Sequence, residues 1–171
     1  LAEMMQADEG YRVPAVDWDR TNGRVMTIDW IDGTKISETQ ALKDAGHDLP
    51  ALARRLVLTF LHQAIRGGYF HADMHQGNLF VEADGSIAAI DFGIMGRIDR
   101  RAQLWLAEIL YGLTTGNYRR VAEIHFEAQY VPSYHSVDEF ATALRAVGEP
   151  TRGRPVSELS VGQMLDSLFA I

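Results

Sequence analysis

The chain has 171 residues, 47% of them hydrophobic and 23% charged, which is ordinary for one globular domain with a substantial core. Its formal net charge of −7 argues against a general nucleic-acid-binding surface, and the absence of Cys excludes disulfides, zinc–thiolate sites and Cys nucleophiles. No apolar run approaches the roughly 20 residues that cross a bilayer. The sequence begins at Leu1, with no initiator Met and no signal-like segment, so we expect part of a longer chain.

The first third of the chain predicts the end of a helix and then a β-hairpin. Residues 1–10 are typical of a helix that stops at Gly10. Residues 11–18 and 24–31 are expected to be two strands, and Asn22-Gly23 supplies the positive φ angles that a tight turn between them needs. The chain then changes character after Asp32-Gly33.

The remainder is predicted to be mostly helical, with a small sheet inserted. Strands at residues 78–82 and 87–90 flank an Asp84-Gly85 turn, after a strand and a loop. Apolar residues at helical spacing predict helices over 37–45, from Leu52 to Gly67-Gly68, and over 100–115, 118–129, 137–147 and 161–171. We therefore predict an α+β fold, with a β-hairpin of roughly 30 residues before a helical body.

The stretch from Tyr69 to Arg97 carries the residues with the clearest chemical meaning. Asp73 and Asn78 are five positions apart, and Asp91 follows Asn78 after thirteen more. Phe92-Gly93 completes an Asp-Phe-Gly triplet directly after an apolar run. This is the layout of a kinase-type catalytic loop, a short hairpin and a metal-binding Asp.

These residue types suit phosphoryl transfer, which needs positioning and charge neutralisation more than covalent chemistry. Asp73 is the candidate carboxylate beside the attacking oxygen. Asn78 and Asp91 supply the hard oxygen ligands that a phosphate-bridging metal ion prefers. Gly77 and Gly93 allow sharp backbone turns next to these ligands.

Two passages resemble the UbiB/ABC1/ADCK family of atypical kinases. HADMHQGN, with IDFGIMGRID after it, is similar to the family's catalytic loop, which usually reads His-x-Asp-Pro-His-Pro-Gly-Asn, and YRVPAVDWDRTNGRVMTIDWIDG is similar to its strand and hinge. The chain departs from the family at Met74 and Gln76, where Pro is usual, and at Ile28-Asp29, where Met-Glu is usual. The likeness covers about residues 11–115.

The resemblance implies a protein-kinase-like fold that binds ATP or ADP with Mg²⁺ and supports ubiquinone (coenzyme Q) biosynthesis. Residues 1–32 are then the end of the N-terminal lobe, with its last β-hairpin and the hinge. Residues 33–171 are the mostly helical C-terminal lobe with its catalytic-loop hairpin. The implied roles are catalysis by Asp73 and His75, metal and nucleotide binding by Asn78 and Asp91, and adenine binding by backbone near Asp29, Trp30 and Ile31.

A kinase-type site also needs a phosphate-binding Lys and its Glu partner upstream of the hinge. Lys35 and Lys43, the two Lys among sixteen basic residues, both follow it. The family's Lys-x-Gly-Gln motif and Ala-rich nucleotide loop are absent as well, so we expect the isolated chain to be inactive. The implied partners are an isoprenoid or quinone lipid precursor and other ubiquinone-biosynthesis proteins, with no nucleic acid. The implied location is the cytoplasmic side of a bacterial inner membrane, contacted through regions outside this chain.

The segment after Asp91 bears on the phosphoryl acceptor. Only eight residues separate Asp91 from the predicted helix start at Arg100. Protein kinases place a longer activation segment there, ending in Ala-Pro-Glu, and use it to bind peptides. We therefore expect a small-molecule or lipid-linked acceptor, or ATP hydrolysis coupled to another event.

Other interpretations remain open from the sequence. Asp73, Asn78 and Asp91 are also common turn residues, and His71, Asp73 and His75 alternate as zinc or iron ligands would on one face of a strand. A nucleotide-binding, pseudokinase-like scaffold for membrane-associated partners is one alternative function. A small-molecule phosphotransferase of the aminoglycoside or choline kinase type is another, because it shares a similar Asp-Asn-Asp layout.

Overall fold

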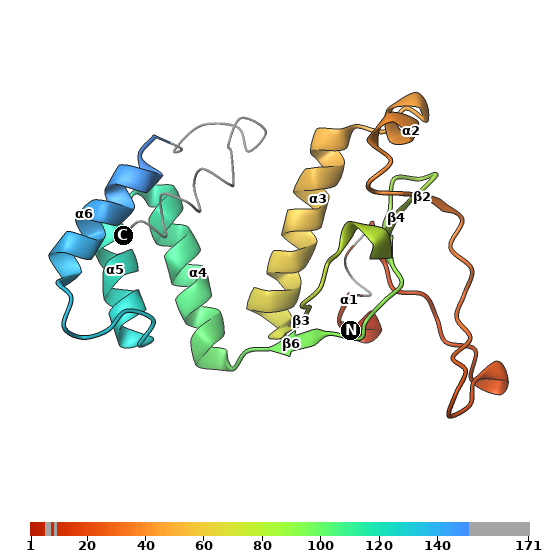
Figure 1. Ribbon diagram of the computed structural model, residues 1–171, viewed down its shortest axis with the longest axis horizontal. Coiled ribbons are helices and arrows are strands. Elements are labelled where there is room, and N and C mark those ends of the chain that lie inside the picture. Colours follow the sequence, from red (N-terminus) through yellow and green to blue (C-terminus); the bar gives the residue numbers. More distant parts are fainter. Residues whose placement is uncertain (6–7, 9, 151–171) are drawn as a thin grey trace. The chain divides into compact units, whose positions relative to one another are not determined.

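The computed structural model describes residues 1–5, 8 and 10–150, and the chain divides into two compact units, residues 1–98 and 99–171 (Figure 1). The first unit mixes short strands with helices and helical turns: α1 (Ala2–Met5), β1 (Tyr11–Arg12), η1 (Trp18–Arg20), β2 (Gly33–Lys35), α2 (Thr39–Asp44), α3 (Leu49–Leu61), η2 (His62–Gly67), β3 (Tyr69–His71), η3 (Gln76–Asn78), β4 (Leu79–Glu82), β5 (Ile87–Ala89) and β6 (Met95–Arg97). In the second unit the described residues form α4 (Arg100–Thr115), α5 (Tyr118–Glu127) and α6 (Val137–Gly148). The predicted α+β class is confirmed.

The first unit is built on a four-stranded sheet in the order β1-β5-β4-β2. β4 and β5 form the predicted antiparallel hairpin, in which Val81 is opposite Ile87. β1 runs parallel to β5, with Tyr11 opposite Ile87, and β2 runs antiparallel to β4. A separate two-stranded sheet pairs β3 with β6, and His71 is opposite Met95.

The core of this unit lies against the β4–β5 hairpin. All three residues of β5 are fully buried, and β4 alternates between buried Leu79 and Val81 and half-buried neighbours. Leu42 of α2 and Leu52 of α3 join the same apolar cluster. Burial of consecutive β5 residues means that both faces of this strand are covered, as expected for the central position it occupies in the sheet.

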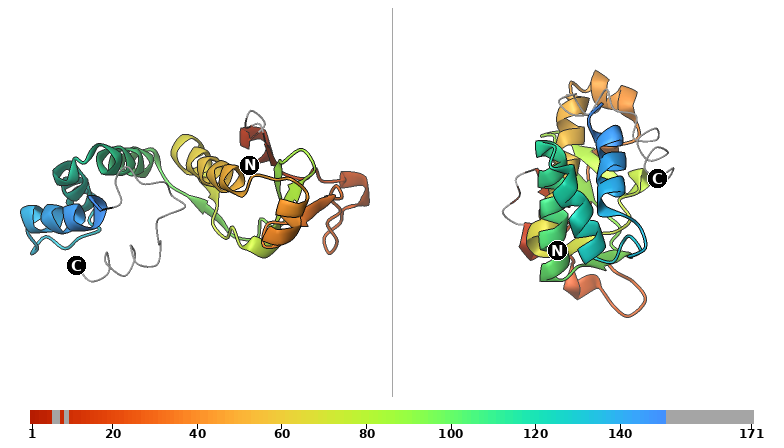
Figure 2. Two further views of the ribbon diagram at one scale, coloured as in Figure 1. Left: turned by 90° about the horizontal axis from the view of Figure 1, so that it is seen from above. Right: turned by 90° about the vertical axis from the view of Figure 1, so that its left-hand side faces the viewer.

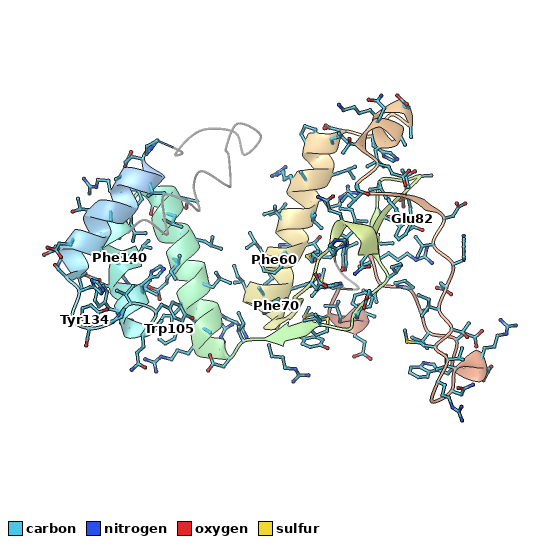
Figure 3. The ribbon with its side chains drawn as sticks, in the orientation of Figure 1. Phe60, Phe70, Glu82, Trp105, Tyr134 and Phe140 are labelled. Atoms are coloured by element: carbon cyan, nitrogen blue, oxygen red, sulfur yellow. The ribbon has the colours of Figure 1, made fainter. Side chains whose placement is uncertain are left out.

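Helix α3 begins three residues earlier than the apolar pattern predicts. Asp48 caps it by accepting a hydrogen bond from the Ala51 N–H, and Pro50 fits within the first turn, where no intrahelical donor is needed. The wider turn η2 follows directly, and Gly68, at φ +63°, ends it in the left-handed region. Phe60 of α3 meets Phe70 of β3 edge to face at 5.6 Å (Figure 3).

The predicted hairpin of residues 11–18 and 24–31 is confirmed only in part, because its two segments pair antiparallel at Val16 and Ile28 but do not form two regular strands. Only Tyr11–Arg12 is a strand, and the rest of the segment projects from the sheet with two isolated antiparallel bridges (Figures 1 and 2). A turn does form at Asn22-Gly23, where Asn22 and Val25 exchange backbone hydrogen bonds of 2.8 and 3.3 Å. Neither Asn22 nor Gly23 has the positive φ angle that the Asn-Gly pair predicted, so that part of the prediction is wrong. Trp30 is 87% exposed, so this segment lacks the covered face that stabilises a strand pair.

The helices of the second unit match the sequence-based prediction closely. Asp99 caps α4 at Arg100, and Gly116, at φ +77°, ends it. α5 and α6 pack together around Tyr118, Val121 and Leu144. The predicted helix over residues 161–171 lies outside the described residues.

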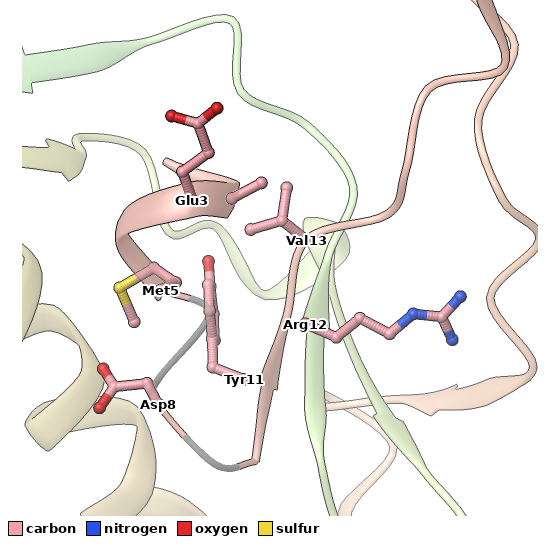
Figure 4. Close-up of a pocket in the computed structure, with 7 residues that line it drawn as sticks. Glu3, Met5, Asp8, Tyr11, Arg12 and Val13 are labelled. Atoms are coloured by element: carbon pink, nitrogen blue, oxygen red, sulfur yellow. The ribbon is translucent and has the colours of Figure 1, made fainter.

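Tyr11 of β1 borders a pocket of about 370 Å³ formed with α1, and its side chain points away from that of the next residue, Arg12 (Figure 4). Among the described residues its hydroxyl has no hydrogen-bond partner. Burial raises the pKa of Tyr11 from 10.0 to about 12, opposed in part by the nearby Gln63 amide. Because the folded state holds this proton more tightly than the unfolded state, the resulting stability is present below pH 10 and is lost between pH 10 and 12.

Replacement of Tyr11 by Phe should remove this alkaline loss, which amounts to at most about 2–3 kcal/mol. At pH 8 the variant should be as stable as the wild type or slightly more so, because an unpartnered buried hydroxyl is removed. Urea unfolding at pH 8 and at pH 11.5 measures both effects. Tyr134→Phe, at a side chain that is 82% exposed, is the matched control and should behave like the wild type. An equal alkaline loss in Tyr11→Phe would contradict the prediction.

Candidate active site

The predicted catalytic stretch folds into two loops that are tied together at both ends. The Ile90 N–H donates to the Asn78 backbone oxygen at 3.0 Å, and the Ala72 N–H donates to the Ile94 backbone oxygen, also at 3.0 Å. The loop of residues 90–94 is therefore held at its start and at its end by the two ends of the loop of residues 72–78. This pairing brings the backbones of Asp73, Asn78 and Asp91 to the same end of the two strand pairs.

Asp91 is exposed and closes a local turn. Its Oδ1 accepts the Gly93 N–H at 2.8 Å. A Cβ at position 93 would lie 3.2 Å from that oxygen, so Gly allows the close approach. The second carboxylate oxygen has no hydrogen-bond partner within the described part of the chain and is open to a ligand.

Asp73 and Asn78 use their backbones for structure and leave their side chains open. The Asp73 N–H donates to His71 Nδ1 at 3.1 Å, and its backbone oxygen accepts the His75 N–H at 2.7 Å. The Asn78 N–H donates to the His75 backbone oxygen at 2.9 Å. Neither side chain has a hydrogen-bond partner in the ranges that the structure describes, so their oxygens are free to contact a ligand.

His71 and His75 have different environments. His71 is 2% exposed, its Nδ1 accepts a backbone hydrogen bond, and its ring lies 5.3 Å from that of Phe92. His75 is exposed, and its Nδ1 accepts the Gly77 N–H at 3.1 Å, which closes the turn η3. The geometry favours a structural role for His71 and counts against the arrangement of His71, Asp73 and His75 as three metal ligands. A catalytic role for His75 stays a prediction.

The three predicted hinge residues, Asp29, Trp30 and Ile31, differ in their contacts and in their exposure. The Asp29 carboxylate accepts the Ala15 N–H at 3.3 Å and pairs with Arg12 at 3.5 Å, while Arg12 also bonds Glu82 at 2.6 Å. Trp30 is exposed and Ile31 is half-buried. Asp29 therefore holds the hinge segment against Arg12 of β1, and Arg12 in turn bonds Glu82 of β4. Adenine binding by Asp29, Trp30 and Ile31 stays a prediction. The pairing of Arg12 with Glu82 could not be predicted from the sequence, because 70 positions separate the two residues.

The donor set of Asn78 and Asp91 suits Mg²⁺ bound with a nucleotide. Mg²⁺ usually takes one or two carboxylates together with phosphate oxygens and water, and does not need an all-protein cage. The described residues contain no group of three or more His, Cys, Asp or Glu side chains that could hold a metal ion. One carboxylate and one amide at this loop end therefore fit a metal that the nucleotide helps to bind.

Sequence comparison places the chain among kinase-like proteins. The profile of the ABC1 atypical kinase-like domain matches residues 1–125. The chain therefore belongs to the ABC1 atypical kinase-like family, as its motifs predicted. The kinase-like fold class is confirmed with it.

Curated relatives extend the match over the whole chain. A probable protein kinase UbiB of Xanthomonas axonopodis pv. citri is 37% identical over 177 residues, which cover 100% of this chain and 32% of the relative. A protein of the same name from Marinobacter nauticus is 40% identical over 161 residues, covering 92% of this chain and 29% of its own length. The chain thus spans about a third of the length of these relatives.

A solved structure, that of the bifunctional kinase-methyltransferase WbdD, aligns with 98% of this chain and 38% of its own, at 15% identity and a TM-score of 0.38. That likeness is too weak to support a comparison of residues. No helix among the described residues combines the length and apolar character needed to cross a membrane.

Proposed function

We propose that the protein is an ATP- and Mg²⁺-dependent atypical kinase or ATPase of the UbiB type that supports ubiquinone biosynthesis. The observation that carries the proposal is the double backbone tie between residues 72–78 and 90–94, which holds the two loops that carry Asp73, Asn78 and Asp91 against each other. Membership of the ABC1 family supports the same reaction class. The names of its curated relatives, probable protein kinases, point in that direction too.

Asp73, Asn78 and Asp91 would have different roles in phosphoryl transfer. Asp91 and Asn78 would hold Mg²⁺, which when bound neutralises charge on the phosphate oxygens. Asp73, with its carboxylate free, would orient the attacking hydroxyl or water and accept its proton. The Gly93 N–H fixes one Asp91 oxygen, so that this carboxylate is oriented before a ligand arrives.

The acceptor we propose is a small molecule, a lipid-linked precursor of quinone type, or water in a coupled ATPase cycle. Helix α4 begins at Arg100, and part of the short segment before it is the strand β6, which pairs with β3. This leaves little chain for a peptide-binding platform. Other ubiquinone-biosynthesis proteins, and the cytoplasmic face of a bacterial inner membrane reached through regions outside this chain, complete the proposal.

The test is ATP turnover by the protein expressed from its full reading frame, measured with Mg²⁺ and after its removal by EDTA. We expect turnover only with Mg²⁺, and no phosphorylation of a peptide array above a no-enzyme background. Strong peptide phosphorylation would contradict the proposed acceptor class. Nucleotide binding without any Mg²⁺-dependent turnover would instead support the pseudokinase-like scaffold.

A further inference from the structure

Gln63 is a polar side chain placed where an apolar one is expected. It lies in η2, the wide turn that continues α3, and is 0% exposed. Its neighbours along the apolar stripe include Phe60 and Ala64. Buried polar groups are retained when they satisfy another buried group, so the contacts of this amide indicate its role.

The Gln63 side chain bonds the backbone of β3. Its Oε1 accepts the His71 N–H at 2.9 Å, and both residues are buried. In β3 the opposite edge is occupied by β6, where His71 is opposite Met95. Gln63 therefore supplies the acceptor for a buried N–H of a strand that has one partner strand.

His71, which Gln63 holds in place, contacts both loops of the candidate site. Its Nδ1 accepts the Asp73 N–H at 3.1 Å, and its ring contacts Phe92, the residue after Asp91. Because Nδ1 accepts this hydrogen bond, the tautomer that fits carries its proton on Nε2, which has no hydrogen-bond partner among the described residues. The chain of contacts therefore runs from the amide of Gln63 to the backbone of His71, and from the ring of His71 to Asp73 and Phe92.

Gln63 is also close to the sheet. The amide lies near the Tyr11 hydroxyl of β1, although neither Gln63 Nε2 nor Tyr11 Oη has a hydrogen-bond partner among the described residues. The wide turn η2 thus places one amide between β1 and β3. An apolar side chain of the same length could fill this space but could not hold the His71 N–H.

We propose that Gln63 is a positioning residue for phosphoryl transfer, which sets the relative placement of the Asp73 loop and the Asp91 loop through His71. The inference rests on the proposed function for its catalytic consequence. The placement itself depends only on the hydrogen bonds of Gln63 and His71. The two parts can therefore be tested separately.

The experiment compares Gln63→Met, which keeps the length and loses the acceptor, with Gln63→Glu, which keeps an acceptor oxygen. Gln40→Met is the matched control, because Gln40 is exposed on α2 and contacts only the Asp44 side chain through its amide. All variants are made in the protein expressed from its full reading frame. Amide hydrogen exchange, the dissociation constant of Mg·ADP, and kcat and KM for ATP are measured for each.

In Gln63→Met we expect the His71 and Asp73 amides to exchange about tenfold faster or more, while amides of β4 and β5 keep their protection. We expect kcat to fall by about 10- to 100-fold and Mg·ADP affinity to change less than about threefold. Gln63→Glu should recover most of the lost kcat, and Gln40→Met should match the wild type.

The inference would be overturned by unchanged exchange at Asp73, by unchanged kcat in the presence of altered exchange, or by an equal loss of kcat in Gln63→Glu and Gln63→Met. Faster exchange throughout β4 and β5 would also overturn it, because Gln63 would then be only a core residue. If the wild type shows no Mg²⁺-dependent turnover, the proposed function fails, and the exchange at Asp73 alone decides the positioning role.

Discussion

Replacement of Asp91 by Asn should reduce Mg²⁺-dependent nucleotide affinity and turnover by about 100-fold or more, equivalent to about 2.7 kcal/mol. Asn has the shape of Asp, and its Oδ1 can still accept the Gly93 N–H, so the local turn should persist. The variant loses the negative charge that a hard divalent cation requires. Calorimetric titration of Mg·ATP at several Mg²⁺ concentrations, followed by steady-state turnover, measures the loss.

Asp84→Asn is a closely matched control for this substitution. Asp84 lies in the turn between β4 and β5, where its Oδ1 accepts the Ser86 N–H at 2.8 Å, the same local geometry as in Asp91 and Gly93. It is exposed and lies at the opposite end of the hairpin from the candidate site. We expect Asp84→Asn to bind and turn over nucleotide normally. Equal affinity in Asp91→Asn and Asp84→Asn would remove Asp91 from the metal site.

Local features of the sequence predicted the helices of the second unit well. Asp99 and Gly116 mark the two ends of α4, and both act through contacts within one helical turn. The β4–β5 hairpin was predictable for the same reason, because the Asp84-Gly85 turn joins strands that are adjacent in sequence. Such interactions depend on few neighbours and can be recognised without a tertiary structure.

Pairings between distant segments could not be predicted in this way. The parallel pairing of β1 with β5 joins Tyr11 to Ile87, and the short strands β2 and β6 exist because partner strands lie beside them. The strands predicted at residues 11–18 and 24–31 were too long for the same reason, because the sequence does not show which face of a segment is covered by distant parts of the chain. Their apolar residues include Trp18, Val25 and Met26, which are exposed in the structure, so they do not mark a buried face.

In the candidate site, too, local features could be predicted from the sequence, whereas contacts between distant segments could not. Asp73, Asn78 and Asp91 could be chosen from their spacing, because catalytic-loop spacing is a property of the chain. The residues that support them act across the fold: Gln63 bonds His71 from a helical turn, and Arg12 bonds Glu82 from another strand. The sequence did contain one indication that Gln63 has a special role, because it is a polar residue within an apolar helical stripe. Its partner could be identified only from the structure.

Replacement of Asp73 by Asn should separate catalysis from nucleotide binding. The carboxylate makes no hydrogen bond to any described residue, and the loop is held by the backbone groups of Asp73. The substitution should therefore leave the fold and the metal ligands intact and remove the group that accepts the proton. We expect kcat to fall by about 10²- to 10⁴-fold, with the dissociation constant of Mg·ATP changed by less than about threefold.

Direct titration of Mg·ATP and single-turnover kinetics, on the protein expressed from its full reading frame, measure the two quantities independently. Asp84→Asn again serves as the control. The contrast with Asp91→Asn is decisive, because a lost metal ligand weakens binding, whereas a lost base slows only the chemical step. If Asp91→Asn abolishes nucleotide binding while Asp73→Asn leaves all measured rates unchanged, Asp73 is not a catalytic group. The loop would then serve a nucleotide-binding scaffold instead of a phosphotransferase.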